Sequence, residues 1–158
     1  MQSSIGLFGE LSEPQRKGQA TEAVIKAAFV LRDYPVLEPA YDNEAYDFVV
    51  EVRGAFLRIQ AKTARKTGTG TIQFETATTK VRSSGYVRDD YSGEIEYFAV
   101  YAAWLDGIYL VPIEEAAKGK MELRYQKPDN NQTIGINWHE EYLMDEQLAA
   151  ECTGENSE

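Results

Sequence analysis

The sequence predicts an α/β fold with a long N-terminal helix, several short strands and a terminal helix. Apolar residues recur at helical spacing over residues 13–33, whereas residues 46–60 and 95–111 carry short apolar runs bounded by turn signals. The 158 residues are enough to bury a core without disulfides. We therefore expect a single domain over residues 1–150, followed by a disordered acidic tail at residues 151–158.

The first predicted element is an amphipathic helix over residues 13–33. Ser12 followed three residues later by Gln15 has the pattern of a capping box, and Pro14 suits a first helical turn. The apolar stripe expected to face the core consists of Val24, Ile25, Ala28 and Leu31.

Two neighbouring strands are predicted over residues 46–60, after a short strand at residues 34–37. A tight turn at Arg53-Gly54 joins them. An even number of turn residues pairs Asp47 with Gln60. A slip of one residue would move the apolar side chains to the polar face, so the core itself favours this register.

Three polar side chains of these strands are expected to lie together. Side chains alternate between the two faces of a strand, which places Gln60 and Lys62 on the same face. In the favoured register Asp47 lies opposite Gln60 at the end of the strand pair. We therefore expect a carboxylate, an amide and an ammonium group to meet on one face of the sheet.

The rest of the chain alternates between strands and turns. Residues 69–76 alternate around Ile72 and Phe74 as a third, exposed strand, and the polar residues 77–92 are predicted to form a loop with at most a turn or two of helix. The later predicted elements are a buried strand at 95–104, a hairpin turn at Asp106-Gly107 returning through 108–111, a short helix at 114–118, a strand at 121–125, a turn at 129–131 and a terminal helix at 138–150.

Composition excludes several kinds of site. Cys152 is the only cysteine, so intramolecular disulfides and multi-cysteine zinc sites are excluded. His139 is the only histidine, which argues against chemistry based on a histidine pair. No apolar stretch is long enough to span a membrane, and the N-terminus lacks the order of a secretion signal, so we expect a cytoplasmic protein without a membrane partner.

The charge of the chain is unevenly distributed. The net charge is −10, yet residues 53–88 hold eight basic side chains against one acid, Glu75. This segment therefore carries +7 and the remainder of the chain carries −17. A solvated basic loop is one interpretation. Because the segment begins beside the three polar side chains, we favour a phosphate-binding surface.

Oxygen-bearing groups at this position suit a magnesium ion, with manganese as an expected substitute. Magnesium prefers oxygen ligands, which Asp47, Gln60 and the Ala61 carbonyl can provide. Lys62 could orient the attacking water or stabilise charge that develops on phosphorus. Glu22, on the first helix, could add a second carboxylate directly or through a water. This chemistry points to hydrolysis of a phosphodiester.

Each of these residues also has a plainer interpretation. Asp47 could simply begin a strand near a turn. Gln60 and Lys62 could be ordinary residues on the solvent face of a strand. Glu22 could pair with Lys26 at i,i+4 on the helix surface.

Several motifs in order resemble the PD-(D/E)XK nuclease superfamily. They are Lys17-Gly18 with Glu22, then Tyr46-Asp47, then Ile59-Gln60-Ala61-Lys62-Thr63. Glutamine at position 60, where the superfamily usually has an acid, resembles the branch of group I intron-encoded homing endonucleases. Further stretches similar to that branch are residues 97–101, 109–113, Arg124, 131–132 and 136–138, so the resemblance extends over residues 16–142.

The resemblance implies a restriction-endonuclease-like mixed β-sheet core flanked by helices, with an added β-hairpin. It also implies magnesium-dependent cleavage of double-stranded DNA by a homo-oligomer, a dimer or tetramer. Glu22, Asp47, Gln60 and Lys62 match the active-site positions. A strand and a polar loop stand between Lys62 and Ile95, where the superfamily has its second core helix.

We expect a homing-type endonuclease whose phosphate contacts give position and whose strand at residues 69–76 reads major-groove edges. The residues expected on the DNA surface are Lys17, Arg65, Lys66, Gln73, Lys80, Arg82 and Arg88. Two alternatives stay open. Arg16-Lys17-Gly18 resembles the helix start of archaeal Holliday junction resolvases, and an inactive DNA-binding module could have the same scaffold.

Overall fold

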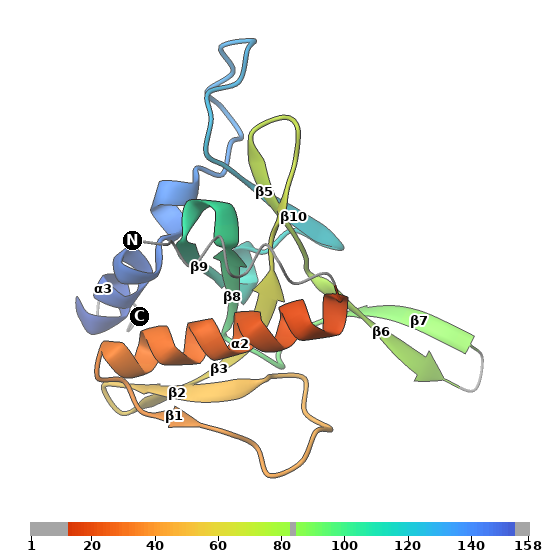
Figure 1. Ribbon diagram of the computed structural model, residues 1–158, viewed down its shortest axis with the longest axis vertical. Coiled ribbons are helices and arrows are strands. Elements are labelled where there is room, and N and C mark those ends of the chain that lie inside the picture. Colours follow the sequence, from red (N-terminus) through yellow and green to blue (C-terminus); the bar gives the residue numbers. More distant parts are fainter. Residues whose placement is uncertain (1–12, 83–84, 154–158) are drawn as a thin grey trace.

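A mixed sheet of five strands forms the centre of the computed structural model, which describes residues 13–82 and 85–153 (Figure 1). The strand order is β1-β2-β3-β8-β9, with β3 and β8 parallel and the other neighbours antiparallel. The bounds are β1 (Val36–Leu37), β2 (Phe48–Val52), β3 (Ala55–Thr63), β8 (Tyr97–Ala102) and β9 (Gly107–Pro112). The predicted mixed α/β fold is confirmed.

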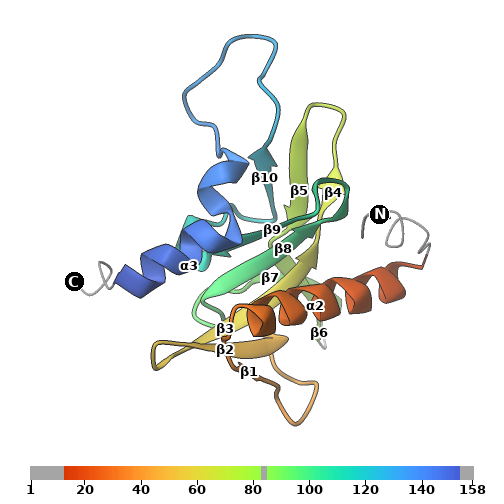
Figure 2. The same cartoon turned by 60° about the vertical axis from the view of Figure 1, so that its left-hand side comes forward.

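Two helices cover one face of this sheet (Figure 2). Helix α2 (Pro14–Leu31) lies across β3 and β8, and helix α3 (Met144–Thr153) packs beside β9. Ile25 and Phe29 of α2 are buried in this layer together with Phe48 of β2. Burial of these apolar side chains is the main force that holds the helices on the sheet.

The start and the stripe of α2 differ in detail from the prediction. The N-cap is Glu13, with Pro14 in the first turn, and Ser12 of the predicted capping box lies outside the described residues. Leu31 is 84% exposed rather than part of the core, because the last turn of the helix ends beside the short edge strand β1. The stripe is therefore shorter at its C-terminal end than its spacing predicted.

A second, smaller sheet covers the other face of the central sheet. It consists of β10 (Lys120–Arg124), β5 (Thr71–Glu75) and β4 (Arg65–Lys66), in that order. Ile72 and Phe74 of β5 are fully buried against Phe98 of β8 and their neighbours. The strand predicted at residues 69–76 is present as β5, but the prediction that it is exposed was wrong, because its apolar side chains belong to a second core.

Residues 77–82 and 85–90 form the two strands of a β-hairpin, where a loop was predicted over residues 77–92. Strand β6 (Ala77–Arg82) pairs with β7 (Gly85–Asp90) in an antiparallel register, and the hairpin extends away from the sheets (Figure 1). Thr78, Thr79 and Val81 are β-branched and favour extended backbone. The polar composition gave no apolar alternation by which these strands could be predicted, because a projecting two-stranded hairpin needs no continuous apolar face.

The connection between the parallel strands β3 and β8 contains β4 to β7 and, in the part that the structure describes, no α-helix. The chain thus leaves the central sheet after β3, contributes β4 and β5 to the small sheet and β6 and β7 to the hairpin, and returns at β8. This agrees with the missing second core helix noted in the sequence.

The C-terminal elements are shifted relative to their predictions. The predicted helix at 114–118 is a 3-10 turn, η2 (Ile113–Glu115), and the predicted helix at 138–150 divides into η3 (His139–Tyr142) and α3. Because α3 continues to Thr153, the first three residues of the predicted tail are helical, and residues 154–158 lie outside the described ranges.

A hydrogen bond joins Glu151 of α3 to the central sheet. The buried hydroxyl of Tyr97 donates a hydrogen bond to its carboxylate. Burial raises the pKa of Tyr97, and the carboxylate of Glu151 raises it further.

Neither helix within residues 13–82 and 85–153 has the length and apolarity that a bilayer span needs.

Candidate active site

The β2–β3 hairpin brings Asp47 next to residues 60 and 61. Arg53 and Gly54 have φ angles of +49° and +83°, the left-handed conformation of a two-residue hairpin turn. The ladder pairs Phe48 with Ile59, which is the predicted register. One step beyond this pair, Asp47 therefore reaches the position opposite Gln60.

Two hydrogen bonds hold Asp47 at the end of the ladder. Its backbone N–H donates to the Ile59 carbonyl at 2.8 Å, and its Oδ2 accepts from the Ala61 N–H at 2.8 Å. The carboxylate thus takes the place of a backbone acceptor where the strand ends. Its direction is set by the backbone of β3.

The electrostatic surroundings of Asp47 leave its charge incompletely compensated. Burial raises the pKa of Asp47, and the nearby carboxylate of Glu22 raises it further. The Ala61 N–H, Lys62 and Lys26 act in the opposite direction but do not outweigh burial. A bound cation would favour the ionised carboxylate.

Two further oxygen-bearing groups lie beside Asp47. The side-chain amide of Gln60 faces the Ala61 carbonyl, with Nε2 to oxygen at 3.5 Å. This contact is long for a hydrogen bond and therefore weak. Rotation of the amide by half a turn would direct Oε1, an acceptor, toward the same region.

Lys62 is held against two aromatic rings next to these groups. Its Nζ donates to the Tyr91 hydroxyl at 3.3 Å and lies 5.0 Å from the centroid of that ring. The Phe98 ring is 6.0 Å from the same nitrogen. The ammonium group is thus in contact with the wall of the cavity that Tyr91 lines.

Glu22 reaches the site from helix α2. It forms the i,i+4 ion pair with Lys26 at 2.8 Å, which was the plainer interpretation, and it also acts on the pKa of Asp47. The neighbouring Thr21 is buried, and its hydroxyl forms a 2.7 Å hydrogen bond with that of Thr63 at the end of β3. This bond fixes the helix against the strand that carries Gln60 and Lys62.

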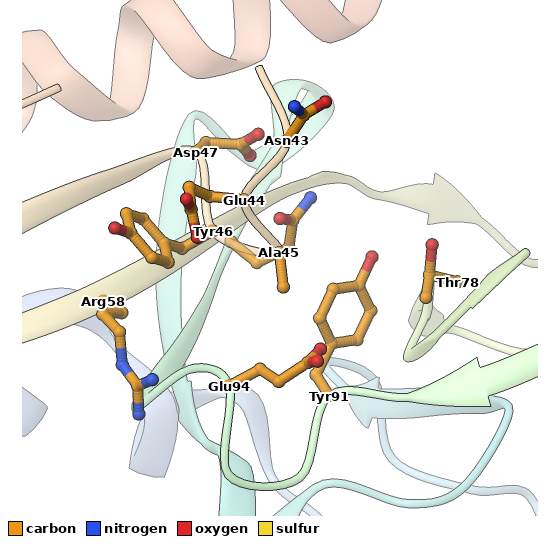
Figure 3. A pocket seen from close by; sticks show the side chains of 10 residues that line it. Asn43, Glu44, Ala45, Tyr46, Asp47, Arg58, Thr78, Tyr91 and Glu94 are labelled. Atoms are coloured by element: carbon orange, nitrogen blue, oxygen red, sulfur yellow. The ribbon is translucent and has the colours of Figure 1, made fainter. Parts of the chain in front are cut away.

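A cavity of about 440 Å³ opens beside Asp47 (Figure 3). Figure 3 shows Asp47 and Asn43 on the side nearest α2, with Tyr91 and Glu94 on the opposite side. The lining residues are Asn43, Glu44, Ala45, Tyr46, Asp47, Arg58, Gln60, Thr78, Tyr91 and Glu94. Polar groups dominate this list, and three of them are carboxylates, so the cavity suits a cation better than a bare anion.

The cavity contains residues that sequence reasoning missed. Arg58 shares a strand face with Gln60, but its guanidinium is paired with Glu96 at 2.7 Å, and Glu96 also accepts the backbone N–H of Arg58 at 2.6 Å. Tyr91 lies within the polar segment 77–92 that was predicted to be loop, so no sequence signal placed it here. Glu94 is brought in by the turn that follows Tyr91.

Carboxylates, imidazoles and thiols alone do not form a metal site here. Within residues 13–82 and 85–153, no group of three or more His, Cys, Asp or Glu side chains lies close enough together to hold an ion. Asp47 would need the neutral oxygens of Gln60 and Ala61 as additional ligands, which is the donor set that the sequence indicated.

The residues expected on the DNA surface lie on five elements. Lys17 is on the first turns of α2, Arg65 and Lys66 are on β4, and Gln73 is on β5. Lys80 and Arg82 are on β6, whereas Arg88 is on β7 in register with Thr79.

Two of these side chains are already engaged within the small sheet. Arg65 pairs with Glu75 at 2.8 Å and donates to Gln73 at 3.1 Å. Gln73 in turn donates to Glu122 at 2.8 Å. Contact with DNA would have to compete with these bonds, whereas Lys66 is exposed on the same strand as Arg65.

Comparison with known proteins gives a matching family and a similar solved structure. The sequence matches the family model described as PD-(D/E)XK endonuclease over residues 12–145. The solved structure of a bacterial homing endonuclease, I-Ssp6803I, superimposes with a TM-score of 0.73 and 19% identity, covering 93% of this chain and 99% of that one. No curated protein matches the sequence.

Proposed function

This chain belongs to the PD-(D/E)XK endonuclease family, and on that premise we propose that it is a metal-dependent endonuclease that cleaves double-stranded DNA at a specific site. Nucleases of this family generally use divalent metal ions. The shared fold with a bacterial homing endonuclease supports the homing type. The remaining support comes from the residues around the cavity.

The position of Asp47 carries the proposal. A half-buried carboxylate with a raised pKa, next to an amide and a backbone carbonyl, gains from a bound cation. One anionic and two neutral oxygens suit Mg²⁺, and Mn²⁺ can take the same ligands. With a single strong anionic ligand, we expect weak metal binding that the phosphate of the substrate strengthens.

We assign Asp47, Gln60 and the Ala61 carbonyl as metal ligands, and Glu22 as a further carboxylate that acts directly or through a water. A bound Mg²⁺ supplies positive charge to a phosphate oxygen and makes a coordinated water more acidic. Lys62 provides a donor and a fixed positive charge for the phosphate as negative charge develops on it.

The DNA surface that we propose follows the basic segment of the chain. Lys17, Lys66 and the hairpin residues Lys80, Arg82 and Arg88 would contact phosphates, and Arg65 with Gln73 would face base edges. Because one cavity of this kind cuts one strand, cleavage of both strands would require a homo-oligomer, a dimer or tetramer. We also propose that the protein is cytoplasmic.

Cleavage assays with matched variants test this function. Plasmid and fragmented genomic DNA are incubated with the protein and Mg²⁺, Mn²⁺ or EDTA. We expect discrete products with either ion and none with EDTA. Lys62→Ala should lower the single-turnover rate by about 100-fold or more while DNA binding persists. Lys118→Ala, at an exposed position away from the cavity, should cleave at the wild-type rate.

The same assay separates the alternatives. Selective cutting of a four-way junction, with no cutting of linear duplex, would identify a junction resolvase. Equal inertness of wild type and Lys62→Ala with both ions, across varied salt, would identify a DNA-binding module without activity.

A further inference from the structure

Tyr91 occupies a defined place between the hairpin and the central sheet. It directly follows β7, is 5% exposed, and its ring packs edge-on against Phe98 with centroids 5.3 Å apart at 86°. Phe98 pairs with Gln60 in the β3–β8 register. The Tyr91 ring is therefore anchored on the strand pair that carries the candidate site.

The hydroxyl and the ring of Tyr91 both contact Lys62. The Tyr91 oxygen accepts from Lys62 Nζ at 3.3 Å, and the same nitrogen lies 5.0 Å from the ring centroid. A lysine ammonium has three donors on a flexible four-carbon stem, so a hydroxyl acceptor and a ring face limit where it can point. Tyr91 also lines the cavity beside Asp47.

We propose that Tyr91 is a positioning residue for Lys62, holding the ammonium group at the edge of the cavity where it meets the scissile phosphate. This inference rests on the proposed nuclease function. Tyr91 itself touches neither metal nor phosphate in this scheme. Its effect on cleavage passes through Lys62.

A purely structural role makes a different prediction. If Tyr91 served only as a buried ring against Phe98, phenylalanine would replace it without loss, because the ring contact and the volume are preserved. Only a role of the hydroxyl predicts a loss in the phenylalanine variant. Tyr91→Phe therefore separates the two roles.

Single-turnover cleavage by Tyr91→Phe is the first test. We expect the rate constant to fall about tenfold, the scale of one hydrogen bond to a charged group, with DNA affinity unchanged. Tyr142→Phe is the matched control: Tyr142 is also 5% exposed, and its hydroxyl bonds to Glu115 at 3.3 Å, away from the cavity. That variant should cleave at the wild-type rate.

Acylation of lysines in the DNA-free protein is the second test and needs no activity. N-hydroxysuccinimide acetate labels lysines according to their accessibility, and peptide mass spectrometry reports each site. In Tyr91→Phe we expect Lys62 to be labelled several-fold faster, whereas exposed Lys66 should keep its rate.

The outcomes distinguish this inference from the function on which it rests. If wild type cleaves DNA and Tyr91→Phe cleaves equally fast, or if labelling of Lys62 does not change, the positioning role is overturned and the nuclease stands. If wild type does not cleave with either ion, both fall.

Discussion

At the scale of single residues, the candidate site is a partly desolvated carboxylate surrounded by weakly engaged polar groups. Asp47 accepts one backbone hydrogen bond, and Gln60 makes one long contact. Such groups stabilise the folded protein little by themselves. A metal ion bound between these groups would explain why they lie together.

Replacing Asp47 by asparagine should stabilise the metal-free protein while abolishing cleavage. Burial raises the pKa of Asp47 above its ordinary value of 3.8, so the folded protein holds this proton more tightly than the unfolded chain. Ionisation of Asp47 therefore lowers the free energy of unfolding as pH rises from about 3.8 through the raised pKa. Asp47→Asn removes this cost and keeps an acceptor for the Ala61 N–H.

Thermal unfolding of both proteins in EDTA from pH 3 to pH 8 measures the effect. The Tm of Asp47→Asn should exceed that of wild type near neutral pH, and the difference should vanish at the acidic end. A difference that does not depend on pH would contradict the assigned cause. Added Mn²⁺ should raise the Tm of wild type alone.

Gln60→Glu should convert a weak metal site into a stronger one. An added unit charge about 4 Å from a cation is worth about 1 to 4 kcal/mol, depending on the local dielectric. We expect the Kd for Mn²⁺, measured by calorimetry, to fall at least about fivefold. Gln126→Glu, an exposed change elsewhere, should leave it unaltered. Unchanged affinity in Gln60→Glu would mean that position 60 does not face the ion.

The sequence predicted part of this site for a physical reason. Alternation along a strand and a two-residue turn are local rules, and together they brought Asp47 opposite Gln60. Tyr91 and Glu94 could not be found in that way, because their position beside the cavity depends on how the long connection between β3 and β8 returns to the central sheet. No local pattern encodes that return.

At the scale of elements, the contact between α2 and β3 determines where Glu22 lies. The Thr21–Thr63 hydrogen bond joins the helix and the strand at the end that carries the site. The sequence predicted the helix from its apolar period, but its contact with β3 at Thr63 is tertiary. The β6–β7 hairpin was missed for a related reason, since its polar strands lack the apolar alternation that marks a half-buried sheet.

Removing one of these hydroxyls should destabilise the protein more than removing both. Thr63→Val keeps the side-chain shape but leaves the hydroxyl of Thr21, which is 1% exposed, without this bond, which costs about 1 to 3 kcal/mol in the free energy of unfolding. In Thr21→Val/Thr63→Val neither hydroxyl remains, so part of the loss should be recovered.

Urea unfolding of the two single variants and the double variant measures this coupling. A double variant whose loss equals the sum of the single losses would indicate that the two hydroxyls act independently.

At the scale of the whole molecule, charge and architecture are both asymmetric. Basic residues gather between positions 53 and 88, the segment that contains β3 and most of the connection from β3 to β8. The chain as a whole carries a net charge of −10. The net charge therefore opposes DNA at long range, and the basic segment must act at short range. The second sheet, unlike the charge, could not be read from the sequence, since β5 pairs with β10 from a distant part of the chain.

Neutralising the hairpin should weaken DNA binding and its dependence on salt. Each phosphate contact contributes about 0.9 to the slope of log affinity against log salt concentration, so Lys80→Ala/Arg82→Ala/Arg88→Ala should reduce the slope by up to about 2.7. Fluorescence anisotropy with duplex DNA between about 50 and 200 mM salt measures it. Lys118→Ala/Lys120→Ala is the control, with an unchanged slope. An unchanged slope in the triple variant would exclude the hairpin from the DNA surface.

The parallel pairing of β3 with β8 also has a consequence for how the chain folds. It joins Ile59 to Tyr97, 38 positions later, whereas the β2–β3 hairpin closes over two residues. Local hairpins form within microseconds, but pairs with high contact order wait for a large loop to close. A newly made chain should therefore bring Asp47 and Gln60 together early and dock Tyr91 on Lys62 late. Until β8 pairs with β3 the chain would hold half a site, and only the native state would hold the complete one.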